Sequence, residues 1–113
     1  MDIEPYRLDK EIIRQTMQRI VNDFAFFNIT LFYSGNEEHA YTEMSAQLNQ
    51  VIDNIAVNNT SLLMQIIYKI DISEQQLQKC MEHNPDKTFT ESVAHLIIER
   101  EMQKVITRKI FTP

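Results

Sequence analysis

The side chains best suited to metal chemistry are two histidine–glutamate pairs, His39 with Glu43 and His95 with Glu99. A separation of four residues places both side chains on one helical face, so each pair offers a nitrogen and an oxygen to an ion. The known di-metal pattern of helical bundles is Glu-x-x-His, and neither pair has that spacing. We therefore interpret both as polar pairs, with His95 partly buried and holding Glu91 or Glu99. We expect no metal and no other cofactor.

The single cysteine is the next candidate for chemistry, because Cys80 lies three residues before His83. A nucleophilic cysteine needs a base and an electropositive, accessible setting. Cys80 instead falls on an apolar helix face with Leu77 and Met81, which favours core packing. No serine has the context of a nucleophile elbow, and no carboxylate pair has an apolar setting. We expect no catalytic residues and no enzymatic activity.

Two short predicted helices, joined by a turn at residues 71–73, have apolar residues where a DNA-binding helix-turn-helix buries them. These residues are Ile66, Ile70, Ile72, Leu77 and Cys80. Residues 60–83 therefore resemble that motif, and the resemblance implies a DNA-binding regulator. The side chains that would then face bases are Gln75, Gln76, Gln78 and Lys79.

Three features depart from the helix-turn-helix pattern. Ile67 occupies a position where a small residue, usually alanine, lets the two helices approach each other. Asp71 replaces the usual turn glycine. The second helix, residues 74–82, holds two acidic residues and one basic residue, and this charge would repel phosphate. A DNA-binding regulator is therefore the alternative to the function that we favour.

The composition restricts the partners and the location of the protein. Its 113 residues include 16 acidic and 11 basic side chains, and the net charge of −5 disfavours nucleic acid and anionic membranes. The densest apolar stretch, residues 24–33, is about half as long as a membrane span. The acidic N-terminus lacks the apolar region of a secretory signal, and one cysteine allows no internal disulfide. We expect a cytoplasmic protein that does not enter membranes.

The charged residues are unevenly distributed along the chain. Arg100, Lys104 and Arg108 recur every four residues, which predicts a basic stripe on the last helix. Residues 34–58, in contrast, hold four acidic residues and no lysine or arginine. We interpret the stripe as a solvated face opposing this acidic segment, within the protein or across a dimer. The alternative is a binding face for an acidic partner or RNA.

The elements that must position these residues are predicted to be helices. One glycine and three prolines are too few turn residues for many short strands. Period-3.6 patterns predict one all-α domain over residues 1–113. It is a compact bundle of about five helices, in which helices one, two and five are long and two short helices lie between. The boundaries are predicted near residues 34–36, 58–60, 71–73 and 84–88, with capping boxes at Ser34/Glu37, Ser73/Gln76 and Thr88/Glu91.

The apolar stripes predict which residues form the core. The stripe of the first helix begins at Leu8 and includes Phe24 and Phe27. The stripe of the last helix contains Val93, Ala94, Ile97, Ile98, Met102, Val105, Ile106 and Ile110. Residues 27–33 alternate like a strand, but a lone strand would leave its backbone groups unpaired. We therefore expect the first helix to continue through this segment.

Aromatic residues concentrate at Phe24, Phe26, Phe27, Phe32 and Tyr33. On a helix Phe26 is offset by about 200° from Phe24, so the rings need cover on more than one face. Either neighbouring helices or a second chain must supply that cover, and a two-fold dimer is the simpler solution. We therefore expect a small, non-catalytic protein–protein interaction module that self-associates or binds another protein. The interface candidates are Phe26, Phe32 and Tyr33.

Overall fold

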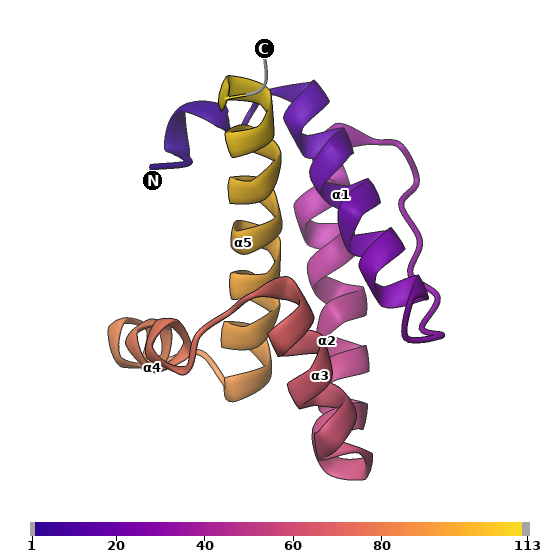
Figure 1. Cartoon of the computed structure of the whole chain (residues 1–113), viewed down its shortest axis with the longest axis vertical. Helices are drawn as coiled ribbons and strands as arrows, with labels where there is room; N and C mark the ends of the chain where they lie inside the picture. Colours follow the sequence, from indigo (N-terminus) through magenta and orange to yellow (C-terminus); the bar gives the residue numbers. More distant parts are fainter. Residues whose placement is uncertain (1, 112–113) are drawn as a thin grey trace.

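The computed structural model describes residues 2–111 as a helical protein, and this part of the chain contains no β-strand (Figure 1). The two short 3-10 helices are η1 (Glu4–Tyr6) and η2 (Glu37–His39). The α-helices are α1 (Lys10–Ala25), α2 (Ala40–Asn58), α3 (Thr60–Ile70), α4 (Glu74–His83) and α5 (Phe89–Phe111). The predicted all-α bundle, with three long helices and two short ones between α2 and α5, is confirmed.

Helix α5 is the centre of the bundle, because each of the other four α-helices contacts it. Figure 1 shows that α1 and α2 run in the same direction and that α5 runs in the opposite direction. An extended segment, residues 28–36, returns the chain along α1 so that α2 can begin beside the start of α1. None of the described helices combines the length and the apolar character needed to cross a bilayer.

The core lies between the inner faces of α1, α2, α3 and α5. Its largest fully buried side chains include Phe24, Met17, Met44, Leu48, Ile66, Ile97 and Met102. The predicted stripe of α5 is buried from Val93 to Ile106, whereas Ile110 is 49% exposed. Leu8 lies outside the core and is exposed, because α1 begins only at Lys10. Helix α4 buries none of its residues completely, and Met81 faces solvent.

Side-chain caps fix most of the helix starts. Ser73 and Gln76 form the predicted capping box of α4, and Thr88 and Glu91 exchange the corresponding hydrogen bonds at α5. Asn59 caps α3 by accepting a hydrogen bond from the backbone N–H of Leu62 at 3.1 Å. The box predicted at Ser34 and Glu37 is wrong. Asn36 caps η2 instead, with its side chain accepting from the N–H groups of Glu38 and His39.

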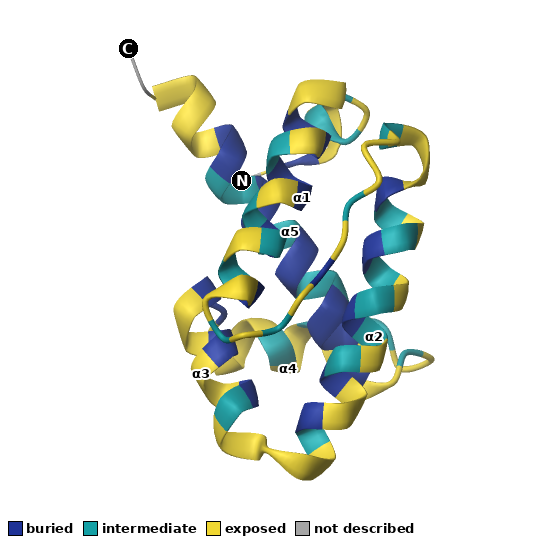
Figure 2. Ribbon diagram, turned by 90° about the vertical axis from the view of Figure 1, so that its right-hand side faces the viewer, coloured by how far each residue is buried: buried dark blue, intermediate teal, exposed yellow. Residues whose placement is uncertain are grey.

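The expected continuation of the first helix through residues 27–33 is also wrong. Helix α1 ends at Ala25, and Asn28 has a left-handed backbone with φ of 61°. The chain then runs extended over the bundle surface, and exposed residues alternate with buried or partly buried ones (Figure 2). Leu31 is buried, whereas Thr30 and Phe32 are exposed. Side chains of α2 supply the hydrogen bonds that a lone strand would lack.

Candidate interaction surface

Phe26 is a large aromatic side chain held in a defined position at the surface. It caps the C-terminal end of α1 and is 70% exposed. Its ring packs edge-on against Phe27, with centroids 5.1 Å apart, and the ammonium of Lys69 lies 4.2 Å from its centroid. An exposed cation–π contact contributes about 0.5–1 kcal/mol. These contacts connect the end of α1 to α3 and leave most of the ring open to solvent.

Phe32 is presented by a backbone that α2 holds in place. The side-chain Oε1 of Gln47 accepts from the Phe32 N–H at 2.8 Å, and its Nε2 donates to the Phe32 carbonyl at 2.7 Å. Two residues further on, the Ser34 N–H donates to Glu43 Oε1 at 2.7 Å. With Leu31 turned into the core, the Phe32 side chain must point outward, and it is 65% exposed.

Tyr33, the third predicted interface residue, has a different environment. Its ring is partly buried against the main core, and its hydroxyl is buried without a hydrogen-bond partner among the described residues. Burial raises the pKa of the Tyr33 phenol, and the carboxylates of Glu37 and Glu43 add to that effect. The ring therefore supports the extended segment from within, while Phe26 and Phe32 face solvent.

The sequence patterns did not reveal two further exposed apolar side chains. They also did not reveal the two groups that hold the aromatic residues, the Gln47 amide at Phe32 and the Lys69 ammonium at Phe26. Met64 and Tyr68 are four residues apart on α3, and both are exposed. Their spacing places both on one helical face, about 100° from the buried Leu63 and Ile67, and could have revealed them. No local pattern links Gln47 to Phe32 or Lys69 to Phe26, because these contacts join segments far apart in the sequence.

The predicted basic stripe lies along α5, but its ion-pair partners come from outside residues 34–58. Arg100 donates from Nη2 to Asp71 Oδ2 at 2.9 Å and from Nε to the Asp71 carbonyl at 3.1 Å. Lys104 Nζ lies 3.0 Å from Glu101 Oε1, and Glu101 is fully buried. Within the described part of the chain, Arg108 makes no ion pair.

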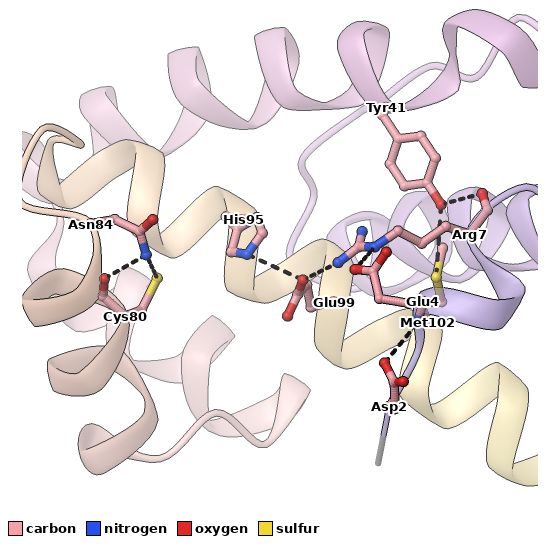
Figure 3. Close-up of polar contacts among 9 residues, drawn as sticks. All are labelled: Asp2, Glu4, Arg7, Tyr41, Cys80, Asn84, His95, Glu99 and Met102. Atoms are coloured by element: carbon pink, nitrogen blue, oxygen red, sulfur yellow. Dashed lines mark hydrogen bonds and ion pairs between the residues drawn. The ribbon is translucent and has the colours of Figure 1, made fainter.

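The His95–Glu99 pair belongs to a partly buried polar network (Figure 3). His95 Nε2 is 3.2 Å from Glu99 Oε1, and the same oxygen accepts from Arg7 Nη2 at 2.5 Å. The Tyr41 hydroxyl donates to the Arg7 carbonyl at 2.9 Å. The hydrogen bond from His95, followed by that from Arg7, lowers the pKa of Glu99 to about 2 despite its partial burial. The network thus ties the N-terminal segment to α2 and α5.

The other histidine–glutamate pair is placed differently. His39 is exposed in η2, and the Glu43 carboxylate is occupied by the backbone of Ser34. Over residues 2–111, no three histidine, cysteine, aspartate or glutamate side chains form a group that could hold a metal ion.

The α3–α4 segment reproduces some features of the helix-turn-helix resemblance. Asp71 adopts the left-handed conformation, with φ of 69°, at the position where the motif usually has glycine. Ile67 is buried, and Cys80 is partly buried, with its carbonyl accepting from the Asn84 amide at 2.9 Å. The exposed residues of α4 include Gln75, Gln76, Gln78 and Lys79 together with Glu74 and Glu82. The acidic ends of α4 therefore share its surface with the polar residues.

No family model, curated protein or solved structure matches this chain. Its function must therefore be inferred from the surfaces that the described residues present.

Proposed function

We propose that the protein is a small, non-catalytic interaction module that forms a two-fold homodimer through the surface around Phe26 and Phe32. One observation carries this proposal: two large aromatic side chains are mostly exposed on backbone that the chain itself holds in place. Large apolar groups fixed at a surface are typical of interface centres, because little conformational entropy is lost when a partner covers them.

The free energy gained by burying the phenylalanine rings suits a dimer of moderate affinity. Complete burial of one phenylalanine side chain contributes about 1.5–3 kcal/mol. A two-fold interface covers Phe26 and Phe32 of both chains, four rings in all, for about 6–12 kcal/mol. Association itself costs about 4–15 kcal/mol in lost motion. The two ranges overlap, so burial of the four rings is comparable to the cost of association, and any further contact area strengthens the dimer.

A second copy fits this surface because the surface is self-complementary. It presents the Phe26 ring together with the Lys69 ammonium, which lies over that ring within the same chain. In a two-fold arrangement this lysine can also approach an aromatic ring of the other chain, so each copy supplies both a cation and rings. The described residues cover only the smaller part of Phe26 and of Phe32, which leaves the rest to another molecule.

The decisive experiment measures molar mass by light scattering coupled to size exclusion, at about 50 µM, a concentration suited to micromolar affinity. The wild-type chain should have twice the mass of the 13.4 kDa monomer. The double variant Phe26→Ser/Phe32→Ser should be monomeric, with an unchanged far-ultraviolet circular dichroism spectrum.

The matched control is Leu8→Ser/Val57→Ser. Leu8 is 89% exposed and Val57 is 83% exposed, and both lie outside the proposed interface. This control removes the same number of exposed apolar side chains and should remain dimeric. A monomeric wild-type chain, or equal dissociation of both double variants, would contradict the proposal.

The proposal places this module in the cytoplasm, away from membranes and nucleic acid. The single cysteine suits a reducing compartment, and the net charge of −5 opposes anionic surfaces. Fractionation of source cells, with detection by an antibody against the chain, tests the location. Recovery of the protein in a membrane or secreted fraction would contradict it.

A further inference from the structure

A groove between α1 and the C-terminal half of α5 concentrates positive charge in a protein that is acidic overall. The groove has a volume of 480 Å³. It is lined by Arg19, Arg100, Lys104, Thr107, Arg108 and Phe111. A second hollow of 190 Å³ shares Arg19 and Arg108 with it and adds Arg14. In the larger groove, four cationic side chains from two helices therefore converge on one concave surface.

The carboxylate nearest to the groove cations lies beneath the surface and offsets part of their charge. Glu101 is fully buried, with Oε1 3.0 Å from Lys104 Nζ and Oε2 3.7 Å from Arg19 Nε. The Arg19 Nε atom is itself buried and has no hydrogen-bond partner in the described part of the chain. Arg108 makes no ion pair there. Among the groove cations in the described residues, Arg108 is therefore the one whose guanidinium is left for a ligand.

Two other carboxylates, those of Asp23 and Asp71, affect the net charge of the groove. Burial raises the pKa of Glu101, and Asp23 of α1 is close enough to add to that effect by hydrogen bonding and repulsion. Asp71 is exposed and pairs with Arg100, so it offsets one of the four cations. Arg19, Lys104 and Arg108 remain, with the buried Glu101 and its neighbour Asp23 as their counter-charges.

We infer that this groove binds an oligophosphate, a ligand with two or more linked phosphate groups. Guanidinium groups donate paired hydrogen bonds that match phosphate oxygens, and the groove supplies three arginines and a lysine. Its volume suits a small molecule. The acidic remainder of the protein repels a long polyanion such as nucleic acid, which would extend beyond the groove.

Phe111 provides the means to distinguish two sources of the phosphates. It is exposed at the end of α5 and lines the groove beside the cations. An aromatic base can stack on such a ring, whereas inorganic triphosphate gains nothing from it. Nucleotide and inorganic ligands should therefore respond differently to the change Phe111→Ala.

The test is isothermal titration calorimetry of the full chain with sodium triphosphate, adenosine triphosphate and citrate, all at the same ionic strength. Triphosphate should bind with a Kd of about 100 µM or tighter, and citrate at least about tenfold more weakly. Tighter binding of adenosine triphosphate, lost in Phe111→Ala, would identify a nucleotide. Equal affinities for the two phosphate ligands would identify the inorganic chain as the recognised group.

Charge-matched variants distinguish triphosphate binding in the groove from non-specific electrostatic attraction to the protein. Arg19→Gln/Arg108→Gln should weaken triphosphate binding by about tenfold or more, because it removes two charged donors. Lys10→Gln/Lys79→Gln removes two exposed cations from outside the groove and should change the Kd by less than about twofold. Arg108→Gln alone should retain most of the effect if loss of Arg19 disturbs folding around Glu101.

Three results would overturn the inference. The first is no triphosphate binding by the wild-type chain at about 1 mM. The second is equal weakening in the groove and control variants, which would indicate non-specific attraction. The third is citrate binding as tight as triphosphate binding. None of these results bears on dimer formation, because the groove residues are different from Phe26 and Phe32.

Discussion

The side-chain amide of Gln47 makes the two hydrogen bonds to Phe32 that a neighbouring β-strand would otherwise supply. Its oxygen accepts from the Phe32 N–H, and its nitrogen donates to the Phe32 carbonyl. One side chain of α2 therefore satisfies both backbone groups of an extended residue with no strand beside it. The same contact fixes which way the Phe32 ring faces, and so prepares the proposed dimer surface.

Replacing Gln47 with alanine should lower the free energy of unfolding by about 1–2 kcal/mol, because two partly solvated hydrogen bonds are lost. Chemical denaturation measures this change. The matched control is Gln50→Ala, on the exposed face of the same helix, which should cost less than about 0.5 kcal/mol. Gln47→Ala should also weaken the dimer. Equal stability of the two variants would show that Gln47 does not hold the extended segment.

Truncation of Ile97, at the centre of α5, tests how tightly the core is packed. It is fully buried, so Ile97→Ala should cost about 2–5 kcal/mol of unfolding free energy through lost contacts and a residual cavity. Ile110 is 49% exposed on the same helix, and Ile110→Ala should cost much less. Urea denaturation of both variants provides the comparison. Similar losses would mean that α5 is positioned differently in the bundle.

Glu99 should make the protein sensitive to acid. Its pKa is lowered from 4.5 to about 2 by His95 and Arg7, so the folded state favours the ionised carboxylate. The resulting stability is present above about pH 4.5 and is lost as the pH falls toward 2. The effect is about 1–3 kcal/mol, because the group is partly exposed.

Denaturation at several pH values between 2 and 5 measures this dependence in the wild type and in Glu99→Gln. The wild-type chain should lose more stability on acidification than the variant does. Glu74→Gln, at an exposed position on α4, is the control and should behave like wild type. Parallel pH curves for wild type and Glu99→Gln would contradict the role of this network.

Glu101 should change the pH dependence of stability in the opposite direction to Glu99. Burial, with Asp23 adding to it, raises the pKa of Glu101 from 4.5 to about 7, although Lys104 acts in the other direction. The folded state then binds a proton more tightly than the unfolded chain. This contribution to stability is present below about pH 4.5 and is lost as the pH rises through 7. In Glu101→Gln the decline between pH 4.5 and 7 should flatten, and an unchanged slope would contradict this account.

Local sequence signals predicted the helices well where cap chemistry and periodicity agreed. Ser73 with Gln76, and Thr88 with Glu91, specify helix starts through hydrogen bonds that span only three residues. The α5 stripe is also a local pattern, and it is buried from Val93 to Ile106. Such features depend on neighbours along the chain, so the sequence alone is sufficient to find them.

The conformation of the extended segment could not be predicted from its own residues. Its alternating pattern was visible, but the missing partner strand argued for helix. Gln47 lies fifteen residues beyond Phe32, and nothing in its neighbourhood marks it as the partner of an extended backbone. The sequence predicted only part of the cationic groove, because the rest depends on residues far apart in the chain. The sequence showed the α5 stripe, while the contribution of Arg19 from α1 depends on how the two helices pack.

The most direct test of the account is an isotope-filtered nuclear Overhauser experiment on a mixture of labelled and unlabelled chains. The measurement detects only contacts between different molecules. The proposed dimer predicts intermolecular signals from the ring protons of Phe26 and Phe32, and their loss in Phe26→Ser/Phe32→Ser. Intermolecular signals confined to other parts of the surface, or none at concentrations well above micromolar, would contradict the claim that these rings form the dimer interface.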